Sequence, residues 1–270
     1  MGSGQRISLS LRYARQWDES YFLNFESAQI SLLGNRSENQ DRVAIFAEDK
    51  CLLLAVVDGM GGHSQGARAA EVTLEVLEES FARVSRPIFD PQGFLTLTLA
   101  RAHDRVVELG NGLVLEEKPR ATCALCLVQE GGSYWAHIGD SRICQIRDKR
   151  ITTRTRDHSH VELLLRQGVI HEEEMAEHPM RNFVECCLGG DSALPHMSIT
   201  NKRKLLAGDV LLACTDGLWS GVSDSEMGES AGDAEVAVEE ILRELAEAAV
   251  ANNSPHSDNT SAAALRWQQQ

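Results

Sequence analysis

The sequence predicts an α+β protein in which antiparallel sheets are covered by helices. Three observations favour this class: apolar runs of strand length joined by tight turns, two adjoining segments of helical periodicity, and the grouping of strands and helices in separate blocks. A βαβ protein would instead alternate strands and helices one by one. The 270 residues contain no linker or repeat that would divide them, so we expect a single domain.

The first part of the chain predicts an extension followed by a hairpin meander. Residues 1–24 carry Trp17, Tyr21 and Phe22 without a regular period, and we interpret them as an N-terminal extension that precedes a domain over 25–270. Strand-like runs follow, at 28–33, 42–47 and 51–57. The turn Glu48-Asp49-Lys50 joins the last two of these runs.

Two helices are predicted next, each with one apolar face. The second runs from about 91 to 109 and ends at Gly110-Asn111-Gly112. Their apolar residues recur at intervals of three and four, at Ala70, Leu74, Leu77, Phe81 and Val84 and at Leu95, Leu99, Ala102, Val106 and Leu109.

The second half repeats this order of strands before helices. Strands are expected at 122–129, 133–138, 142–147 and 150–153, with Gly131-Gly132 marking a hairpin. An irregular, partly helical insertion over about 160–191 is expected to lie over a sheet edge. The remaining expectations are a buried strand at 210–214, helices at 223–230 and 233–250, and a last strand at 259–265.

Composition excludes several classes of protein. The net charge of −14 repels polyanions, and Lys and Arg form no basic stripe, so nucleic acid and anionic membranes are not expected partners. No apolar run is long enough to cross a bilayer, no leading signal peptide is evident, and seven cysteines suit a reducing, cytoplasmic location. Cys123 and Cys126 have the spacing of half a zinc site, but side chains three apart on a strand face opposite ways, which favours packed thiols.

The stretch Val57-Asp58-Gly59-Met60-Gly61-Gly62-His63 carries the strongest chemical signal. An apolar strand leads to a carboxylate and then to a turn of glycines, whose bare backbone permits close approach of a charged group. Because a buried Asp is costly unless it is paired or bound to a cation, the stretch indicates a hard metal, or a phosphate held through one. A glycine-rich hairpin with a hydrogen-bonded Asp is the alternative interpretation.

Five acidic residues share one kind of position, beside small or polar residues at the ends of apolar strands. They are Asp41, Asp58, Asp140, Asp216 and Asp258. Singly, each is more typical of a turn cap than of a metal ligand. Together they favour hard divalent ions such as Mg²⁺ and Mn²⁺, which prefer oxygen ligands, and two such ions can promote phosphoryl transfer to water.

Six motifs extend this argument to a family. They are Arg36-Ser37-Glu38-Asn39-Gln40-Asp41, Asp58-Gly59-Met60-Gly61-Gly62-His63, Gly139-Asp140-Ser141-Arg142, Asp157-His158-Ser159, Cys214-Thr215-Asp216-Gly217-Leu218 and Asp258-Asn259. In order and spacing they resemble the metal-dependent protein phosphatases, the PPM or type 2C family, from about residue 28 to 266, and especially its stand-alone bacterial members. The resemblance implies a four-layer α-β-β-α sandwich, with two antiparallel sheets face to face and helices on both sides.

The resemblance also implies a ligand set for Mn²⁺ or Mg²⁺, with two ions and a third, weaker one. By this likeness Asp58 bridges two metals and the Gly59 carbonyl binds one of them. Asp216 and Asp258 match the ligands of the first metal, and Asp41 matches the acid that serves the second. Asp140 matches a ligand of the third metal, which it shares with Asp216. Gln40 stands where many eukaryotic members carry a Glu ligand, so the second metal depends on Asp41.

Two further residues match catalytic positions of the family. Arg36 matches the residue that binds the substrate phosphate, a task that suits a guanidinium fork. His63 matches the proposed general acid for the leaving alkoxide. Outside the resemblance, Arg36 would be interpreted as a surface arginine and His63 as a structural loop histidine. The implied reaction is hydrolysis of phosphoserine and phosphothreonine in proteins by metal-activated water, without a phosphoenzyme.

The resemblance implies partners as well as chemistry. We expect phosphoprotein substrates, opposition to a Hanks-type Ser/Thr kinase, a link to type VI secretion regulation by association only, and a monomer. The insertion over 160–191 resembles the family flap beside the active site. Two alternatives remain, a catalytically silent relative that binds phosphoproteins or a kinase, and a phosphatase of the partner-switching type. Intact carboxylates disfavour the first, and the absence of sensor domains disfavours the second.

Overall fold

The computed structural model describes residues 24–60, 64–175 and 177–268. Its first sheet has five strands in the order β1-β13-β12-β7-β8. These strands are β1 (Asn24–Leu32), β13 (Thr260–Gln268), β12 (Val210–Cys214), β7 (Arg142–Arg147) and β8 (Arg150–Arg154). All of their pairings are antiparallel.

The second sheet follows the order β10-β6-β5-β3-β4-β9, with β11 beside β6 and β2 beside β3. Its long strands are β2 (Asp41–Glu48), β3 (Cys51–Met60), β5 (Cys123–Gln129) and β6 (Gly132–Ile138). Four two-residue strands complete it: β4 (Arg120–Ala121), β9 (Leu188–Gly189), β10 (Ser198–Ile199) and β11 (Arg203–Lys204). These pairings are antiparallel too.

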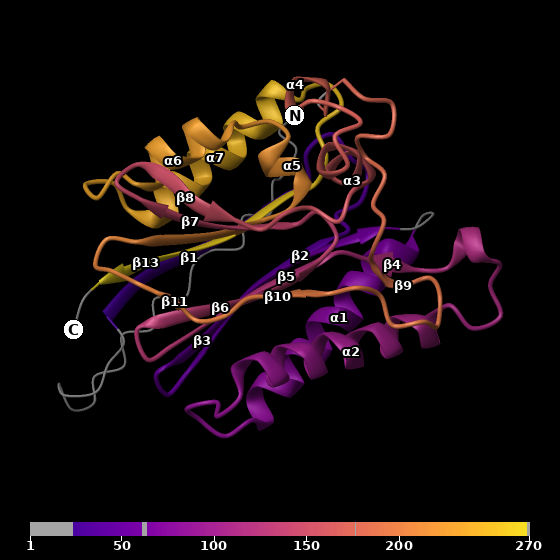
Figure 1. The fold of residues 1–270 in the computed structure, drawn as a ribbon, viewed down its shortest axis with the longest axis horizontal. Helices are drawn as coiled ribbons and strands as arrows, with labels where there is room; N and C mark the ends of the chain where they lie inside the picture. The colour runs from indigo at the N-terminus through magenta and orange to yellow at the C-terminus, as the bar shows by residue number, and fades with distance from the viewer. Residues whose placement is uncertain (1–23, 61–63, 176, 269–270) are drawn as a thin grey trace, which may run out of the picture.

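Helices cover the outer face of each sheet, so that four layers are stacked (Figure 1). The second sheet is covered by α1 (Ser64–Arg83) and α2 (Pro91–Leu109), and the first by α6 (Asp224–Ala231) and α7 (Val238–Asn252). Shorter helices lie in connections: η1 (Leu115–Glu117), α3 (His160–Arg166), α4 (Glu172–Met175) and α5 (Asp216–Trp219). The predicted four-layer α-β-β-α sandwich is confirmed.

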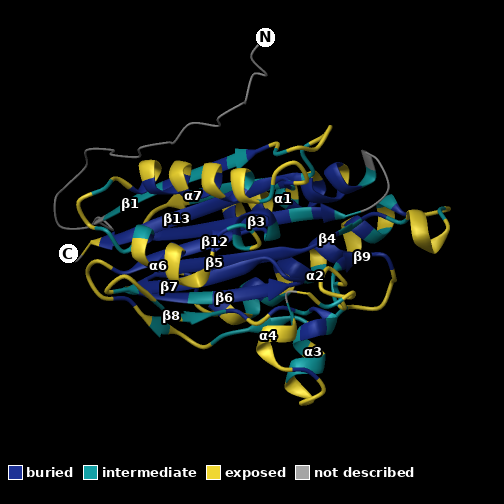
Figure 2. Ribbon diagram, turned by 90° about the horizontal axis from the view of Figure 1, so that it is seen from above, coloured by how far each residue is buried: buried dark blue, intermediate teal, exposed yellow. Residues whose placement is uncertain are grey.

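Three apolar layers hold the sandwich together, and β3 contributes to two of them. Leu53, Ala55 and Val57 face α1 and α2, whereas Leu52, Leu54 and Val56 face the other sheet. Because both faces are buried, the strand is a continuous apolar run instead of an alternating one. Figure 2 shows the buried strands between helices whose outer faces are exposed.

The cysteines lie as the packed-thiol interpretation predicts. Cys123 belongs to the apolar layer under α1 and α2, and Cys126 to the layer between the sheets. Their thiols therefore point to opposite faces of β5 and cannot bind one zinc ion. None of the seven cysteines forms a disulfide.

The sequence prediction placed the start of α7 incorrectly. The helix begins at Val238, not at residue 233, because the preceding residues are held as a loop. The carboxylate of Asp233 accepts hydrogen bonds from the Glu235 amide at 3.1 Å and from Lys149 Nζ at 2.9 Å. Arg266 donates to the carbonyl oxygens of Asp233 and Val236 at 2.6 and 2.9 Å. The predicted ranges of α2, β7 and β12 are confirmed.

Several predicted features lie outside the residues that the structure describes. The N-terminal extension lies outside the described residues except for Asn24, where β1 begins, and so do Gly61, Gly62 and His63. Within the described ranges, no helix is long and apolar enough to cross a membrane.

Candidate metal centre

Two of the predicted ligands, Asp41 and Asp58, lie directly opposite each other on β2 and β3. Opposed residues of an antiparallel pair point to the same face, with Cβ atoms about 4.5–5.5 Å apart. The two carboxylates therefore lie side by side. The sequence predicted Asp58 at the end of its strand, and this was wrong. Strand β3 continues through Gly59 to Met60, and these two residues pair with β4. The sheet thus holds Asp58 on both sides.

Gly59 allows the backbone of another segment to approach the site. A Cβ atom at this position would stand 2.0 Å from the carbonyl oxygen of Gly66 and 2.8 Å from that of Gln40. The Gly59 amide also donates to the Gln40 carbonyl at 3.2 Å. Any larger residue would push the start of α1 away from Asp58.

The end of β12 brings Asp216 to the same place. Thr215 Oγ1 donates a hydrogen bond to Asp41 Oδ2 at 2.8 Å, and the Thr215 amide donates to the Ser261 carbonyl at 3.0 Å. Asp216 is the next residue and the first of α5. Gly217 packs against the Asn259 backbone so closely that a Cβ would lie 2.0 Å from the Asn259 oxygen. This contact brings Asp216 next to the loop that carries Asp258.

Asn259 attaches the loop that carries Arg36. Its side-chain amide donates to the carbonyl oxygens of Leu33 at 2.9 Å and Glu38 at 3.0 Å, and its Oδ1 accepts from the Gln40 amide at 2.8 Å. Within this loop Arg36 Nη2 lies 2.6 Å from Asp258 Oδ2 in an exposed ion pair. The predicted phosphate-binding arginine is therefore within reach of the carboxylates.

The fifth carboxylate, Asp140, lies in the turn between β6 and β7. Its side chain is almost completely buried, and its Oδ1 atom has no hydrogen-bond partner among the described residues. A buried, unpartnered carboxylate oxygen is costly in a folded protein. Its presence here is consistent with a ligand position that a cation completes.

The electrostatics of the five carboxylates show that they influence one another. Burial, followed by the charges of Asp216, Asp41, Asp140 and Asp258, raises the pKa of Asp58 well above its usual value. Burial and then the charges of Asp140, Asp258 and Asp41 raise the pKa of Asp216 in the same way. Burial raises the pKa of Asp41 to about 7 and that of Asp140 to about 6. Crowded carboxylates of this kind bind a divalent cation in place of protons.

The donor set fits Mn²⁺ or Mg²⁺. These ions take oxygen ligands and keep several water molecules, so a site needs only one or two carboxylates for each ion. No three acidic, histidine or cysteine side chains of the described residues form a ready-made cage around one point. An ion held by one or two of these carboxylates would take water as its remaining ligands.

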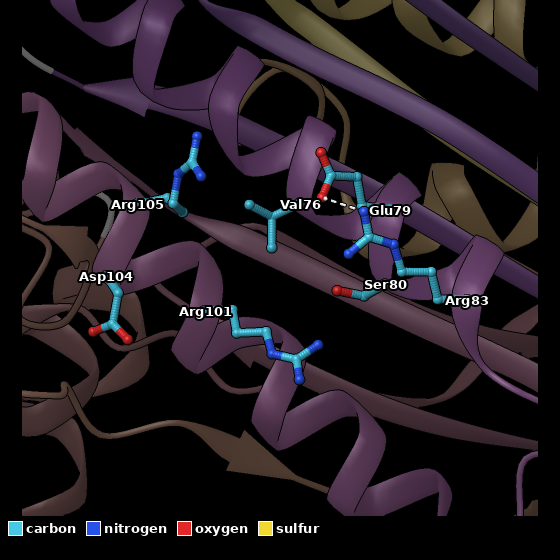
Figure 3. Close-up of a pocket in the computed structure, with 7 residues that line it drawn as sticks. All are labelled: Val76, Glu79, Ser80, Arg83, Arg101, Asp104 and Arg105. Atoms are coloured by element: carbon cyan, nitrogen blue, oxygen red, sulfur yellow. Dashed lines mark ion pairs between the residues drawn. The ribbon is translucent and has the colours of Figure 1, made fainter.

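A separate hollow lies between α1 and α2, far along the helical layer from these carboxylates. It has a volume of about 340 Å³, and Figure 3 shows the residues that line it: Val76, Glu79, Ser80, Arg83, Arg101, Asp104 and Arg105. None of the predicted site residues is among them. The hollow and the group of carboxylates are therefore separate features of the fold.

The sequence prediction named the carboxylates but not the residues that hold them. Thr215, Asn259 and Arg142 stand inside the quoted motifs without a role. The signal that identifies them is their position: Thr215 and Asn259 adjoin Asp216 and Asp258, and Arg142 follows Asp140 by two residues. His63 lies outside the described residues, so its role stays a prediction.

Comparison with known proteins identifies the family. A family model described as protein phosphatase 2C matches residues 31–226. The chain belongs to the protein phosphatase 2C family. Asp258 lies beyond the matched residues, whereas Arg36, Asp41, Asp58, Asp140 and Asp216 lie within them. The predicted family is confirmed, and with it the predicted enzyme class, a metal-dependent protein-serine/threonine phosphatase.

Two curated relatives illustrate the likeness. A protein of Streptococcus pyogenes, named for the 2C type of phosphatase, is 34% identical over 195 residues, which cover 71% of this chain and 78% of the relative. The serine/threonine protein phosphatase PstP of Mycobacterium tuberculosis is 31% identical over 258 residues, covering 93% of this chain. The chain spans only 44% of the length of PstP.

Solved structures agree with the fold and with the metal. The catalytic domain of PstP, solved with two manganese ions, has a TM-score of 0.77 and 27% identity, and the match covers 92% of this chain and all of that one. PppA of Pseudomonas aeruginosa, described as a key regulatory component of type VI secretion, has a TM-score of 0.72 and 26% identity, with 91% and 99% covered. The predicted cofactors, Mn²⁺ or Mg²⁺, are those of this family.

Proposed function

We propose that this protein hydrolyses phosphoserine and phosphothreonine in proteins, using divalent ions held at the sheet ends. The ligands would be the carboxylates of Asp41, Asp58, Asp140, Asp216 and Asp258 together with the Gly59 carbonyl. One observation carries the proposal: the carboxylates gather around Asp58, whose pKa is raised by the charges of the other four, while only Asp258 has an ion pair among the described residues. Family membership supports the same centre.

The metal and the protein divide the chemistry. Bound Mn²⁺ or Mg²⁺ supplies Lewis acidity and lowers the pKa of a water molecule so that it can attack phosphorus. The protein contributes fixed positions, since Asp58 is held within a sheet and Asp216 begins a helix that packs on the Asn259 backbone. Fixed ligands need no reorganisation during the reaction, which favours the transition state.

Arg36 is proposed to bind the substrate phosphate. Its side chain is 56% exposed, so it can leave Asp258 and present two N–H donors to phosphate oxygens. Its position on the loop that Asn259 anchors keeps it beside the carboxylates. His63 is proposed to protonate the leaving alkoxide, as its match to the family motif implies.

The finer assignments are proposals of the same kind. We infer a cytoplasmic monomer that opposes a Ser/Thr kinase. The match to PppA supports a role in type VI secretion regulation as one setting for that activity. The segment over 160–191, which contains α3 and α4, is proposed as a flap that is part of the domain over 25–270.

The deciding experiment is hydrolysis of a phosphothreonine peptide by the purified protein. Release of phosphate with added Mn²⁺, and none with excess chelator, is the expected result. No release at any Mn²⁺ concentration from a folded protein would overturn the proposal and favour a silent phosphoprotein-binding relative.

A further inference from the structure

The motif Asp157-His158-Ser159 has no role in the centre described above, yet it contacts the turn that carries Asp140. Arg142, the first residue of β7, donates to Asp157 through both sides of its guanidinium group, Nε to Oδ1 at 2.9 Å and Nη2 to Oδ2 at 2.6 Å. Both side chains are buried, with exposed fractions of 10% and 5%. A buried bidentate pair fixes the guanidinium plane in one orientation.

The indole ring of Trp219 stacks on the flat face of this guanidinium group. The Arg142 Cζ atom lies 3.6 Å from the centroid of the indole ring. The indole Nε1–H donates to the Asp140 carbonyl at 3.0 Å. Trp219 is the last residue of α5 and Asp216 is the first. One short helix therefore carries both the proposed ligand Asp216 and the indole that bonds to the backbone of Asp140.

His158 provides a second attachment for the same turn. Its amide donates to the Gly139 carbonyl at 2.9 Å, and its Nδ1 accepts from the Gly139 amide at 3.3 Å. Gly139 therefore bonds to His158 through both of its backbone groups, directly before Asp140. The Asp140 Oδ1 atom has no hydrogen-bond partner among the described residues, so the bonds to the Gly139 and Asp140 backbone position this turn.

We propose that Arg142 is a positioning residue that holds Asp140 in place relative to Asp216 for metal binding. The inference rests on the proposed function, because it assumes that these two carboxylates hold an ion. Two like charges beside each other repel when no cation separates them, and a rigid link between their backbones opposes that repulsion. Lysine cannot replace Arg142 here, because it lacks both the planar fork and the flat face.

The chain offers a matched control on the same strand. Arg147, the last residue of β7, also forms a bidentate pair, with Asp209, at 2.6 and 2.7 Å. This pair lies at the opposite end of β7 from Arg142. Comparing Arg142→Lys with Arg147→Lys therefore separates loss of a bidentate pair in general from loss of the link to Asp140.

The test is Mn²⁺ binding by the full chain, measured by titration with electron paramagnetic resonance detection of free Mn²⁺, without any substrate. We expect Arg142→Lys to weaken the lowest-affinity Mn²⁺ site of the wild type about tenfold or more, and Arg147→Lys to leave it unchanged. Trp219→Phe keeps a ring over Arg142 but removes the N–H, and it should weaken the same site less. If the Arg142→Lys protein does not fold, Trp219→Phe serves as the test variant in its place.

The outcomes separate the two proposals. Wild-type affinity in Arg142→Lys and Trp219→Phe, or equal losses in Arg142→Lys and Arg147→Lys, would overturn the positioning role and leave the metal centre intact. A wild-type protein that binds no Mn²⁺ would overturn the metal centre, and this inference with it.

Discussion

Two groups of buried carboxylates in this protein have opposite surroundings. Asp157 and Asp209 each form a bidentate pair with an arginine, and Asp209 also accepts from Gln145 Nε2 and the Leu206 amide, both at 2.9 Å. Asp41 and Asp140 are as deeply buried, but neither has an ion pair within the described ranges. Depth of burial therefore does not distinguish the groups, whereas the presence of a guanidinium does.

The difference shows when the pKa of Asp209 is compared with the pKa of Asp58 and of Asp216. Burial acts to raise the pKa of Asp209, but the bonds from Arg147, Leu206 and Gln145 outweigh it and the pKa is lowered. At the metal centre burial and neighbouring carboxylates act together, and the pKa of Asp58 and Asp216 is raised. The fold gives its structural carboxylates an arginine but gives none to Asp58 or Asp216, so these two need an external cation for their charge, at a cost in the stability of the metal-free protein.

The largest effect is expected from Asp58→Asn, which removes the carboxylate whose pKa is raised by all four other carboxylates of the centre. Activity should fall roughly a thousandfold or more, about 4 kcal/mol of transition-state stabilisation. Without metal the variant should melt at or above the wild-type temperature, because an amide can be buried beside Asp41 and Asp216 without having to take up a proton. Phosphopeptide hydrolysis and thermal melting with and without Mn²⁺ measure the two effects.

Asp224→Asn is a suitable control, since Asp224 is a partly exposed carboxylate paired with Arg154 at 3.1 Å on α6. It should retain activity and the stabilisation by Mn²⁺. Near-normal turnover of a folded Asp58→Asn protein would contradict the assignment of Asp58.

The next effect should appear at a structural carboxylate, as a loss of stability and not of activity. Arg147→Ala leaves the buried Asp209 carboxylate without a guanidinium partner, and the expected cost is about 1–3 kcal/mol, because Arg147 is 34% exposed and Asp209 keeps its bonds from Gln145 and Leu206. Urea denaturation should show this loss in the free energy of unfolding. Activity per folded molecule should remain, because the pair lies at the opposite end of β7 from Arg142.

Adding Asp209→Asn to Arg147→Ala should recover part of the lost stability, since the unpaired charge is then absent. If the double variant were as unstable as the sum of the two single variants, packing and not charge would explain the loss.

The sequence was sufficient to predict the carboxylates but not this difference between them. Apolar period and turn residues predict β7, β12 and α2, because each is set by neighbours in the chain. The pairing of Arg142 with Asp157, and the bond from Trp219 to the Asp140 carbonyl, join residues 15 and 79 positions apart. No local pattern encodes which of several aspartates receives an arginine, so structural and metal-binding aspartates look alike in the sequence.

Short elements were missed for a related reason. The four residues of α5 are Asp-Gly-Leu-Trp, too few to show a helical period, and the sequence there predicts a turn. The two-residue strands β4, β9, β10 and β11 depend on pairing with distant strands. The start of α7 was placed too early because the bonds of Asp233 to Lys149 and from Arg266 are not visible in a local window.

A smaller effect is expected from pH on the metal-free protein. Between about pH 6.5 and 8 the unfolded chain has lost its carboxyl protons, whereas the folded centre still holds part of a proton on Asp41, whose pKa is about 7. The raised pKa of Asp58 and of Asp216 acts in the same direction. The folded state then binds more protons, so its stability should fall as pH rises through this window. Below pH 6.5 the lowered pKa of His158, about 4, works in the opposite direction.

Thermal melting in chelator at pH 6.5, 7.2 and 8.0 tests this sign. Mn²⁺ should reverse the trend, because the metal binds the deprotonated carboxylates and its stabilisation grows as protons leave. Asp58→Asn should flatten the slope in chelator. A melting temperature that rises with pH in chelator would show that the carboxylates are ionised without metal.

The smallest effect is expected from Arg36→Ala, which removes a cation from the rim of the centre. Its pair with Asp258 is exposed, at 56% and 38%, so the variant should lose less than about 1 kcal/mol of unfolding free energy. KM for a phosphopeptide should rise about tenfold with a smaller change in kcat, as expected when binding to ground state and transition state is lost together. Arg243→Ala, which removes an exposed arginine paired with Glu240 on α7, should leave both constants unchanged. An unchanged KM in Arg36→Ala would mean that the phosphate is bound elsewhere, and that Arg36 serves Asp258 as Arg147 serves Asp209.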